Sequence, residues 1–197
     1  MNTSLEKLSQ YSLGSNRILP SEALHLLKHA HLTELMTHAH QTRCYAHGRN
    51  VHFVHSLNLN PTNICENQCG LCAFWRDADA KDAYVLSISE AMKRMEIAKS
   101  WGLTDLHVVG GLTKQLNLDY YIELFRTAKK MLPEIVIQGL TAVEIQWLAD
   151  LEGLTVEDVL LRLKEAGLDA IPGGGAEIFS PRIRNSICPN KITAEQW

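Results

Sequence analysis

The chain has 197 residues, of which 46% are hydrophobic and 21% charged, and its formal net charge is −3. This apolar content suffices for a packed core and excludes a disordered chain, and the slight negative charge gives no electrostatic footprint for nucleic acid. The first residues lack the apolar stretch of a signal peptide, and no run of 18 apolar residues occurs. We therefore expect a cytoplasmic protein without a membrane span.

Residues 1–50 are predicted to form a helical segment. Ser21 follows Pro20 as a candidate N-cap, and the apolar residues after it recur at helical spacing. A second helix is predicted from Thr33 toward Gly48, because glycine is the residue type most often found just after a helix.

From residue 51 onward, predicted strands alternate with predicted helices. Capping-box spacings open two of the helices, at Ser87 with Glu90 and at Thr141 with Glu144. The predicted strands cover residues 51–60, 106–111, 134–139 and 168–172. The predicted helices cover residues 87–102, 118–132, 141–153 and 155–167.

This alternation predicts an α/β fold with parallel strands, as in a (β/α)8 TIM-type barrel. A complete barrel takes roughly 250 residues, and the predicted strands make up about half of one. Thr193 and Gln196 have capping-box spacing, so a helix is expected to begin where the chain stops. We therefore expect an N-terminal helical segment (1–50) followed by the first half of a truncated barrel (51–197).

The cysteines point to the chemistry. There are five, an odd number in a chain without an export signal, so a disulfide framework is not expected and clustered thiols indicate metal binding or redox chemistry. Cys65, Cys69 and Cys72 form a C-x3-C-x2-C motif in the loop after the first predicted strand. Three such thiolates can bind three irons of a [4Fe–4S] cluster and leave the fourth iron open. A zinc site with His55 or Cys188 as fourth ligand is the alternative.

In this position the motif resembles the signature of radical S-adenosylmethionine (SAM) enzymes. The resemblance implies that Cys65, Cys69 and Cys72 bind a [4Fe–4S] cluster whose open iron chelates SAM. One electron from the cluster then cleaves SAM to a 5′-deoxyadenosyl radical. The expected fold is accordingly a partial radical SAM barrel.

A second feature of the same family follows the second predicted strand. Gly110 and Gly111 resemble the glycine pair that lines the amino group of SAM, and glycine lets the backbone approach a ligand closely; alone, such a pair is an ordinary turn. Family members carry an aromatic residue just before the last cysteine, near the adenine. Here that residue is Leu71, and Phe74 and Trp75 are the nearby aromatic alternatives.

Longer segments resemble the menaquinone and deazaflavin branch of the family. They are NPTNICENQCGLCAF, LHVVGGL, GLTAVEI, AGLDAIPGGGAEIF and ICPNKITAEQW. The segment Thr141–Ile145 is most similar to aminofutalosine synthase, whereas a His-Pro pair of the family is replaced by Thr113-Lys114. The alternatives are a cyclic dehypoxanthinylfutalosine synthase, a deazaflavin-precursor synthase subunit and a non-catalytic Fe–S or zinc fragment.

The resemblance to aminofutalosine synthase implies a reaction of the futalosine route to menaquinone. The adenosyl radical adds to the enol-ether double bond of 3-[(1-carboxyvinyl)oxy]benzoate, and decarboxylation gives 6-amino-6-deoxyfutalosine. Reduced flavodoxin or ferredoxin is the electron donor that such an enzyme would use. No catalytic side chain is assigned from the sequence.

Polar residues near the two predicted loops have two interpretations each. Glu177 ends a glycine-rich loop and is expected to accept hydrogen bonds from the ribose of SAM; the alternative is a solvated residue of a flexible loop. Arg76 and Asp77 follow the cysteines, where they would face substrate carboxylates or form a surface ion pair.

Overall fold

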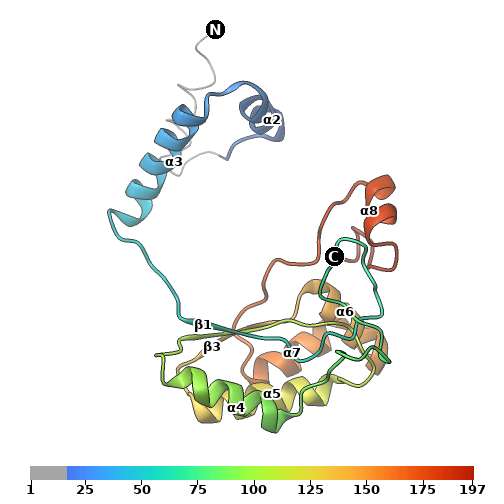
Figure 1. Ribbon diagram of the computed structural model, residues 1–197. Helices are drawn as coiled ribbons and strands as arrows, with labels where there is room; N and C mark the ends of the chain where they lie inside the picture. Colours follow the sequence, from blue (N-terminus) through green and yellow to red (C-terminus); the bar gives the residue numbers. More distant parts are fainter. Residues whose placement is uncertain (1–16) are drawn as a thin grey trace. The chain divides into compact units, whose positions relative to one another are not determined.

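The computed structural model describes residues 17–197, so residues 1–16 of the predicted helical segment lie outside the described residues. The chain divides into two compact units, one that ends at Phe53 and one that spans Val54–Trp197. The first, the helical unit, contains α2 (Pro20–His29) and α3 (Leu32–His47) (Figure 1). Pro20 occupies the first turn of α2, where its missing N–H costs no helical hydrogen bond. Gly48 ends α3 with a φ of 62°, as its residue type predicts.

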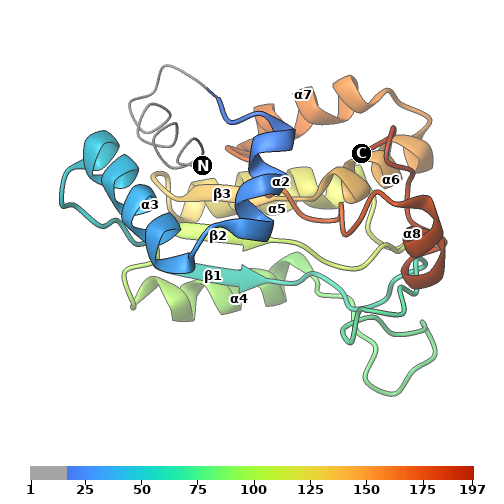
Figure 2. The ribbon, with the colours of Figure 1, turned by 90° about the horizontal axis from the view of Figure 1, so that it is seen from above.

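The second unit, the barrel unit, is built on a parallel sheet in the order β1-β2-β3. Its strands are β1 (Ser56–Leu59), β2 (Asp105–Val108) and β3 (Val136–Gly139). Leu57 pairs with Leu106, and Leu106 pairs with Ile137. The three strands therefore run in the same direction, and their carboxyl ends lie at one edge of the sheet (Figure 2).

Helices cover one face of this sheet. Figure 1 shows α4 (Ile88–Lys99), α5 (Leu118–Met131) and α7 (Val156–Ala166) on the same side, and α6 (Ala142–Glu152) and the short α8 (Pro181–Ile187) complete the unit. Apolar side chains of strands and helices form one core between these layers. Its fully buried members include Leu59, Met95, Leu106, Val108, Leu124, Phe125, Ile137, Leu148, Val159 and Leu163. Among the described residues, every helix is too short or too polar to span a bilayer.

The capping boxes predicted at Ser87 and Thr141 are confirmed, and Thr193 and Gln196 also exchange the two hydrogen bonds of a capping box. The Ser87 backbone N–H donates to Glu90 Oε2 at 2.8 Å, and the Ser87 hydroxyl accepts from the Glu90 N–H at 3.2 Å. Thr141 and Glu144 make the same reciprocal pair at the start of α6. These local bonds satisfy backbone donors that a helix start leaves without partners, which is why the predicted helix starts are accurate.

The strand predictions need correction. The strand predicted over 51–60 spans only Ser56–Leu59, and the one predicted over 168–172 is reduced to a single parallel bridge between Gln138 and Ala170. Pro172 has no N–H to donate, and the glycines after it disfavour extended pairing, so the ladder stops there. Helix α8 was not predicted, although Pro181 opens it. The strand–helix alternation and parallel pairing are nevertheless those of a partial (β/α)8 barrel.

Candidate functional site

Three loops of the barrel unit meet at the carboxyl edge of the sheet. The cysteine loop follows β1, the Gly110-Gly111 pair follows β2, and Thr141 follows β3. In parallel α/β folds this edge is where ligands bind, because all strand ends open onto it. Helix α8 lies at the same end of the sheet (Figure 2). The cysteine loop and the glycine pair, both singled out from the sequence, therefore lie at this edge of the sheet.

A cavity of about 290 Å³, which we call the central cavity, lies among these loops. Its walls come from four parts of the chain: the cysteine loop, the end of β2, the start of α6 and the C-terminal segment. The lining residues are Cys65, Asn67, Cys69, Leu71, Cys72, Trp75, Val109, Gly110, Leu112, Thr141, Val143, Glu144, Gly175, Glu177 and Lys191.

All three motif cysteines line the central cavity. The loop is tightened by a hydrogen bond from the Cys72 N–H to the Cys69 carbonyl at 3.0 Å, and the Trp75 indole donates to the same carbonyl at 3.1 Å. Burial raises the pKa of the Cys69 thiol; nearby Lys191 opposes this rise, whereas the other thiols add to it. Because the raised pKa favours the neutral thiol, a bound metal cation that replaces the proton is what would stabilise the Cys69 thiolate.

Three thiols at one cavity match the ligand number of a [4Fe–4S] cluster with one open iron. Among residues 17–197, no three His, Cys, Asp or Glu side chains are placed to bind one metal ion. A zinc ion needs all its thiolates within about 2.3 Å of one point. In a [4Fe–4S] cluster each thiolate binds a different iron, so thiols spread around a cavity suit it. The donor set of Cys65, Cys69 and Cys72 thus fits the cluster that the sequence predicts.

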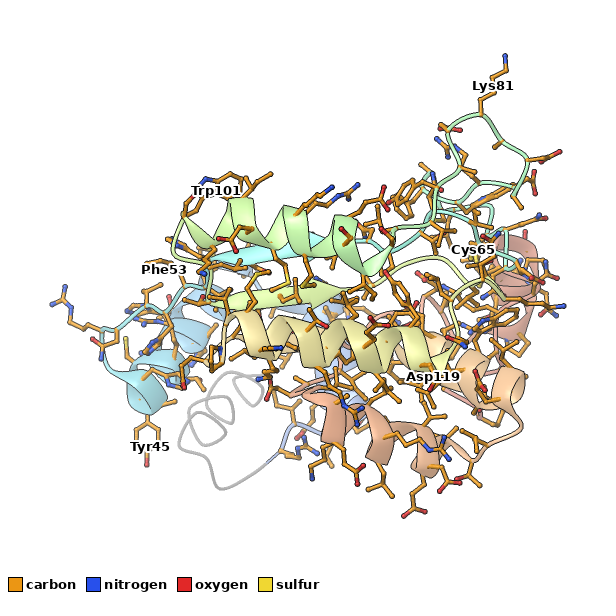
Figure 3. The ribbon with its side chains drawn as sticks, turned by 90° about the horizontal axis from the view of Figure 1, so that it is seen from below. Tyr45, Phe53, Cys65, Lys81, Trp101 and Asp119 are labelled. Atoms are coloured by element: carbon orange, nitrogen blue, oxygen red, sulfur yellow. The ribbon has the colours of Figure 1, made fainter. Side chains whose placement is uncertain are left out.

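The two further ligands considered for zinc do not line the central cavity. His55 precedes β1 and its ring nitrogen Nδ1 lies 3.1 Å from the Trp101 carbonyl, at the amino end of the strands. Figure 3 shows Trp101 and Cys65 at opposite ends of the barrel unit. Cys188 follows α8 and is 1% exposed; it lies near enough to Cys69 to raise the pKa of that thiol, but it does not line the central cavity. Among the described residues, neither His55 nor Cys188 forms a group with the motif cysteines that could hold one metal ion.

The two predicted glycines have different surroundings. Gly110 lines the central cavity and donates its N–H to Glu144 Oε1 at 2.9 Å. Gly111 instead packs against the cysteine loop: a Cβ there would lie 2.1 Å from the Ile64 carbonyl oxygen and 3.0 Å from Cys65 Cβ. Glycine at position 111 is therefore required for the contact between two loops, whereas glycine at position 110 exposes backbone to the cavity.

Glu144 is a buried carboxylate that joins two of the loops. Its Oε1 accepts from Gly110, and its Oε2 accepts from the Thr141 N–H at 2.7 Å and the Thr141 hydroxyl at 2.9 Å. Burial raises the pKa of Glu144, although these hydrogen bonds and the charge of Lys191 oppose the rise. With both oxygens engaged, Glu144 holds the β2 and β3 loops together.

Glu177 reaches the central cavity together with a cation. Lys191 Nζ lies 2.6 Å from Glu177 Oε1, and the two side chains are 12% and 27% exposed, respectively. Glu177 has a φ of 54°, in the left-handed region that costs a non-glycine residue about 1 to 3 kcal/mol unless its surroundings hold it. The glutamate is thus ion-paired at the cavity, although the residue as a whole is exposed.

The remaining predicted residues either line the central cavity or lie outside it, where two of them make local contacts. Leu71 and Trp75 line the central cavity, whereas Phe74 does not. Arg76 pairs with Asp82 at 2.7 Å and donates to three carbonyls of the cysteine loop, so it forms the surface ion pair that was one of its two interpretations. Asp77 likewise accepts a local hydrogen bond, from Gln68 at 2.7 Å.

Sequence reasoning did not identify Glu144 or Lys191 as site residues. Glu144 was recognised only as a helix cap, and a capping glutamate is normally exposed; its burial depends on the loop after β2. Lys191 lies in the ICPNKITAEQW segment, where nothing in the local pattern separates it from a surface lysine. Both assignments depend on how distant segments pack.

Comparisons with known proteins show the family of the chain. The model of the radical SAM superfamily matches residues 59–197. A 5-amino-6-(D-ribitylamino)uracil–L-tyrosine 4-hydroxyphenyl transferase from Methanopyrus kandleri is 42% identical over 150 residues, covering 76% of this chain and 41% of the relative. An aminodeoxyfutalosine synthase from Thermus thermophilus is 35% identical over 190 residues, covering 96% of this chain and 51% of the relative. The chain thus spans about half the length of the curated relatives it matches.

Solved structures agree in fold. The [FeFe]-hydrogenase maturase HydG from Carboxydothermus hydrogenoformans matches with a TM-score of 0.58 at 20% identity, over 85% of this chain and 47% of that structure. Relatives of both the futalosine and the deazaflavin-precursor kind occur, so the predicted branch is supported without a single member being singled out. Because the family match extends over most of the barrel unit, the chain belongs to the radical SAM superfamily, whose enzymes use a [4Fe–4S] cluster and SAM.

Proposed function

We propose that the chain acts in carbon–carbon bond formation of the aminodeoxyfutalosine synthase type. The C5′–S bond of SAM breaks and methionine leaves, the 5′-deoxyadenosyl part is joined to 3-[(1-carboxyvinyl)oxy]benzoate, carbon dioxide is lost, and 6-amino-6-deoxyfutalosine forms. The observation that carries the proposal is the meeting of Cys65, Cys69 and Cys72 with Gly110 and Glu177 around one cavity.

Cys65, Cys69 and Cys72 hold the cluster in this proposal, and the bound cluster supplies the electron that cleaves SAM. The Gly110 N–H is already bonded to Glu144, and no described residue donates a hydrogen bond to the Gly110 carbonyl. This carbonyl is therefore the group at Gly110 that accepts from the SAM ammonium. Gly111 acts indirectly, by letting the loop after β2 pack against the cysteine loop.

The other walls suit an amino-acid and nucleoside ligand. In this proposal Glu177 accepts hydrogen bonds from hydroxyl or ammonium groups of the ligand, and its ion-pair partner Lys191 attracts the carboxylate of the ligand. The apolar side chains of Leu71, Val109 and Val143 exclude water around the reacting groups. An external one-electron donor, such as reduced flavodoxin or ferredoxin, is required.

Two observations favour the futalosine member of the branch. The similarity to the aminodeoxyfutalosine synthase of Thermus thermophilus extends over 96% of the chain, compared with 76% for the transferase of Methanopyrus kandleri. The segment Thr141–Ile145, which resembles aminofutalosine synthases, contributes three residues to the central cavity: Thr141, Val143 and Glu144. The second candidate is the tyrosine hydroxyphenyl transferase activity, which the higher identity of 42% favours.

Electron paramagnetic resonance on the anaerobically reconstituted, reduced chain tests the cluster. We expect a [4Fe–4S]⁺ signal that changes when SAM is added, and loss of that signal in Cys69→Ser but not in Cys44→Ser, which alters a cysteine outside the cavity. A signal indifferent to SAM, or zinc in place of iron, contradicts the proposal.

Product analysis separates the two candidates. The reduced chain is incubated with SAM and either 3-[(1-carboxyvinyl)oxy]benzoate or tyrosine with 5-amino-6-(D-ribitylamino)uracil, and products are identified by mass spectrometry. We expect 6-amino-6-deoxyfutalosine from the first mixture alone. A tyrosine-derived adduct from the second mixture assigns the chain to the transferase candidate instead.

A further inference from the structure

Arg184 is a buried charge that the proposed function leaves without a role. It lies on α8, is 5% exposed, and donates only to backbone carbonyls. Nη1 lies 2.5 Å from the Ala176 oxygen and 3.1 Å from the Ile178 oxygen, and Nε lies 3.1 Å from the Ile192 oxygen, to which Nη2 also donates. Within residues 17–197, no carboxylate forms an ion pair with Arg184.

These carbonyls flank the two charged residues of the central cavity. Ala176 and Ile178 stand on either side of Glu177, whose backbone is left-handed, and Ile192 directly follows Lys191. One guanidinium therefore spans both segments that bring the Glu177–Lys191 pair to the cavity. Arg184 itself is not among the lining residues.

The chemistry of arginine suits this task. A guanidinium is a rigid, planar fork with five donors, so it can join two chain segments in a fixed geometry, whereas a lysine ammonium has three donors on a flexible stem. Four hydrogen bonds also offset the cost of burying the charge. Helix α8 is tied to the cysteine loop as well, because the Gly70 N–H donates to the Ile187 carbonyl at 2.8 Å.

We propose that Arg184 is a positioning residue, which holds residues 176–178 and 192 together so that Glu177 and Lys191 face the ligand of the central cavity. The inference rests on the proposed function only where it identifies that ligand as SAM. The placement of Glu177 and Lys191 at the cavity does not depend on the proposed function. Arg184 acts through Lys191 and touches no ligand.

Acetylation of lysines by acetic anhydride, followed by mass spectrometry, tests the placement without any ligand. Arg184→Gln is expected to raise the acetylation rate of Lys191 several-fold and to leave that of Lys129 unchanged. Lys129 is also partly buried and ion-paired, to Asp169 at 2.8 Å, so it reports general loosening of the barrel unit. Arg182→Gln, an exposed arginine on the same helix, is the matched control and should change neither rate.

SAM affinity of the reconstituted chain tests the link to the ligand. Arg184→Gln is expected to weaken SAM binding about tenfold in the wild-type background, and to have little further effect in a Lys191→Met background. A residue that merely stabilises the fold would lower affinity by the same factor in both backgrounds. If Arg184→Gln does not fold, Arg184→Lys replaces it, because it keeps the buried charge but lacks the planar fork that makes the four hydrogen bonds.

The outcomes are distinct. An unchanged Lys191 rate, or equal increases at Lys191 and Lys129, overturns the positioning role. An increase at Lys191 alone with unaltered SAM affinity overturns the link between the pair and the ligand. If the wild-type chain binds no SAM, the proposed function fails, while the acetylation rates still decide whether Arg184 positions Lys191.

Discussion

At the scale of single residues, Gly111 is the position where the structure excludes a side chain most strictly. A Cβ would lie 2.1 Å from the backbone oxygen of Ile64, and a backbone atom cannot move aside as a flexible side chain can. We expect Gly111→Ala to lower the free energy of unfolding by about 1 to 3 kcal/mol and to reduce the iron bound after reconstitution.

Gly173→Ala is the matched control for this prediction. No atom lies within 4 Å of a Cβ at Gly173, so a change below about 1 kcal/mol is expected. Urea unfolding and iron analysis of both variants provide the measurement. Equal stability and iron content in the two variants would show that the loop after β2 does not need to touch the cysteine loop.

The raised pKa of Glu144 predicts how the free energy of unfolding depends on pH. Burial raises the pKa of Glu144 in the folded protein above its ordinary value of 4.5. Over the interval between the unfolded and folded pKa values, the native state therefore binds more protons than the unfolded state. The stability contribution of Glu144 is therefore fully present below pH 4.5 and falls as pH rises through this interval. Glu144→Gln removes this titration and, by placing an amide donor against backbone N–H groups, costs about 1 to 3 kcal/mol.

The measurement is the free energy of unfolding of wild type and Glu144→Gln in urea between about pH 4 and pH 7. The difference between the two proteins should shrink as pH rises, because only wild type titrates at this position. Carboxylates with lowered pKa, such as Asp169, have the opposite pH dependence but are common to both proteins and cancel. A constant difference would contradict the buried, proton-binding Glu144.

At the scale of elements, two threonine caps allow the local role of a cap to be separated from its role in the site. Thr141 caps α6 at the central cavity, and Thr155 caps α7 away from it, each accepting from a backbone N–H in the first turn. Replacing either by alanine is expected to cost about 1 kcal/mol. Only Thr141→Ala should also weaken SAM binding, since it removes one of the two hydrogen bonds to Glu144 Oε2.

Calorimetric titration of SAM into both reconstituted variants, with urea unfolding in parallel, checks this prediction. The comparison is informative because the two caps are chemically alike and the stability losses are expected to match. Weaker SAM binding in Thr155→Ala as well would attribute the effect to helix stability rather than to the contact with Glu144.

Helices were predictable from the sequence where their ends are determined locally. The boxes at Ser87 and Thr141 and the glycine after α3 fix backbone geometry within a few residues, and the structure has helices there. Strands were predicted too long, because apolar alternation continues beyond the residues that find a partner strand. The segment 168–172 is the clearest case, with one bridge at Ala170.

At the scale of the whole molecule, the same distinction applies to the site. The cysteine motif is a local pattern, so its place in a loop at the carboxyl edge of a parallel sheet could be predicted. Arg184 and Lys191 owe their roles to contacts with residues 176–178, a loop whose path no local pattern specifies. The contributions of Arg184 and Lys191 to the site therefore could not be predicted from the sequence, although Glu177 was expected there.

The open sheet leads to a prediction about association. Within the described residues β1 pairs only with β2, and beyond β3 there is only the bridge at Ala170, so strand edges with unpaired backbone groups remain. Such edges recruit other strands. We expect the molar mass of the 197-residue chain, measured by light scattering after size-exclusion chromatography, to increase with protein concentration.

A charge on the edge strand should oppose this association, because lysines on edge strands hinder pairing with another chain. Asn58→Lys places a charge at an exposed position of β1, and Ser89→Lys adds the same charge at an exposed position of α4. We expect the first variant to shift the mass toward that of the monomer and the second to behave as wild type. If the wild-type chain is a monomer at all concentrations, the strand edges are not free; if both variants reduce association equally, net charge rather than the edge governs it.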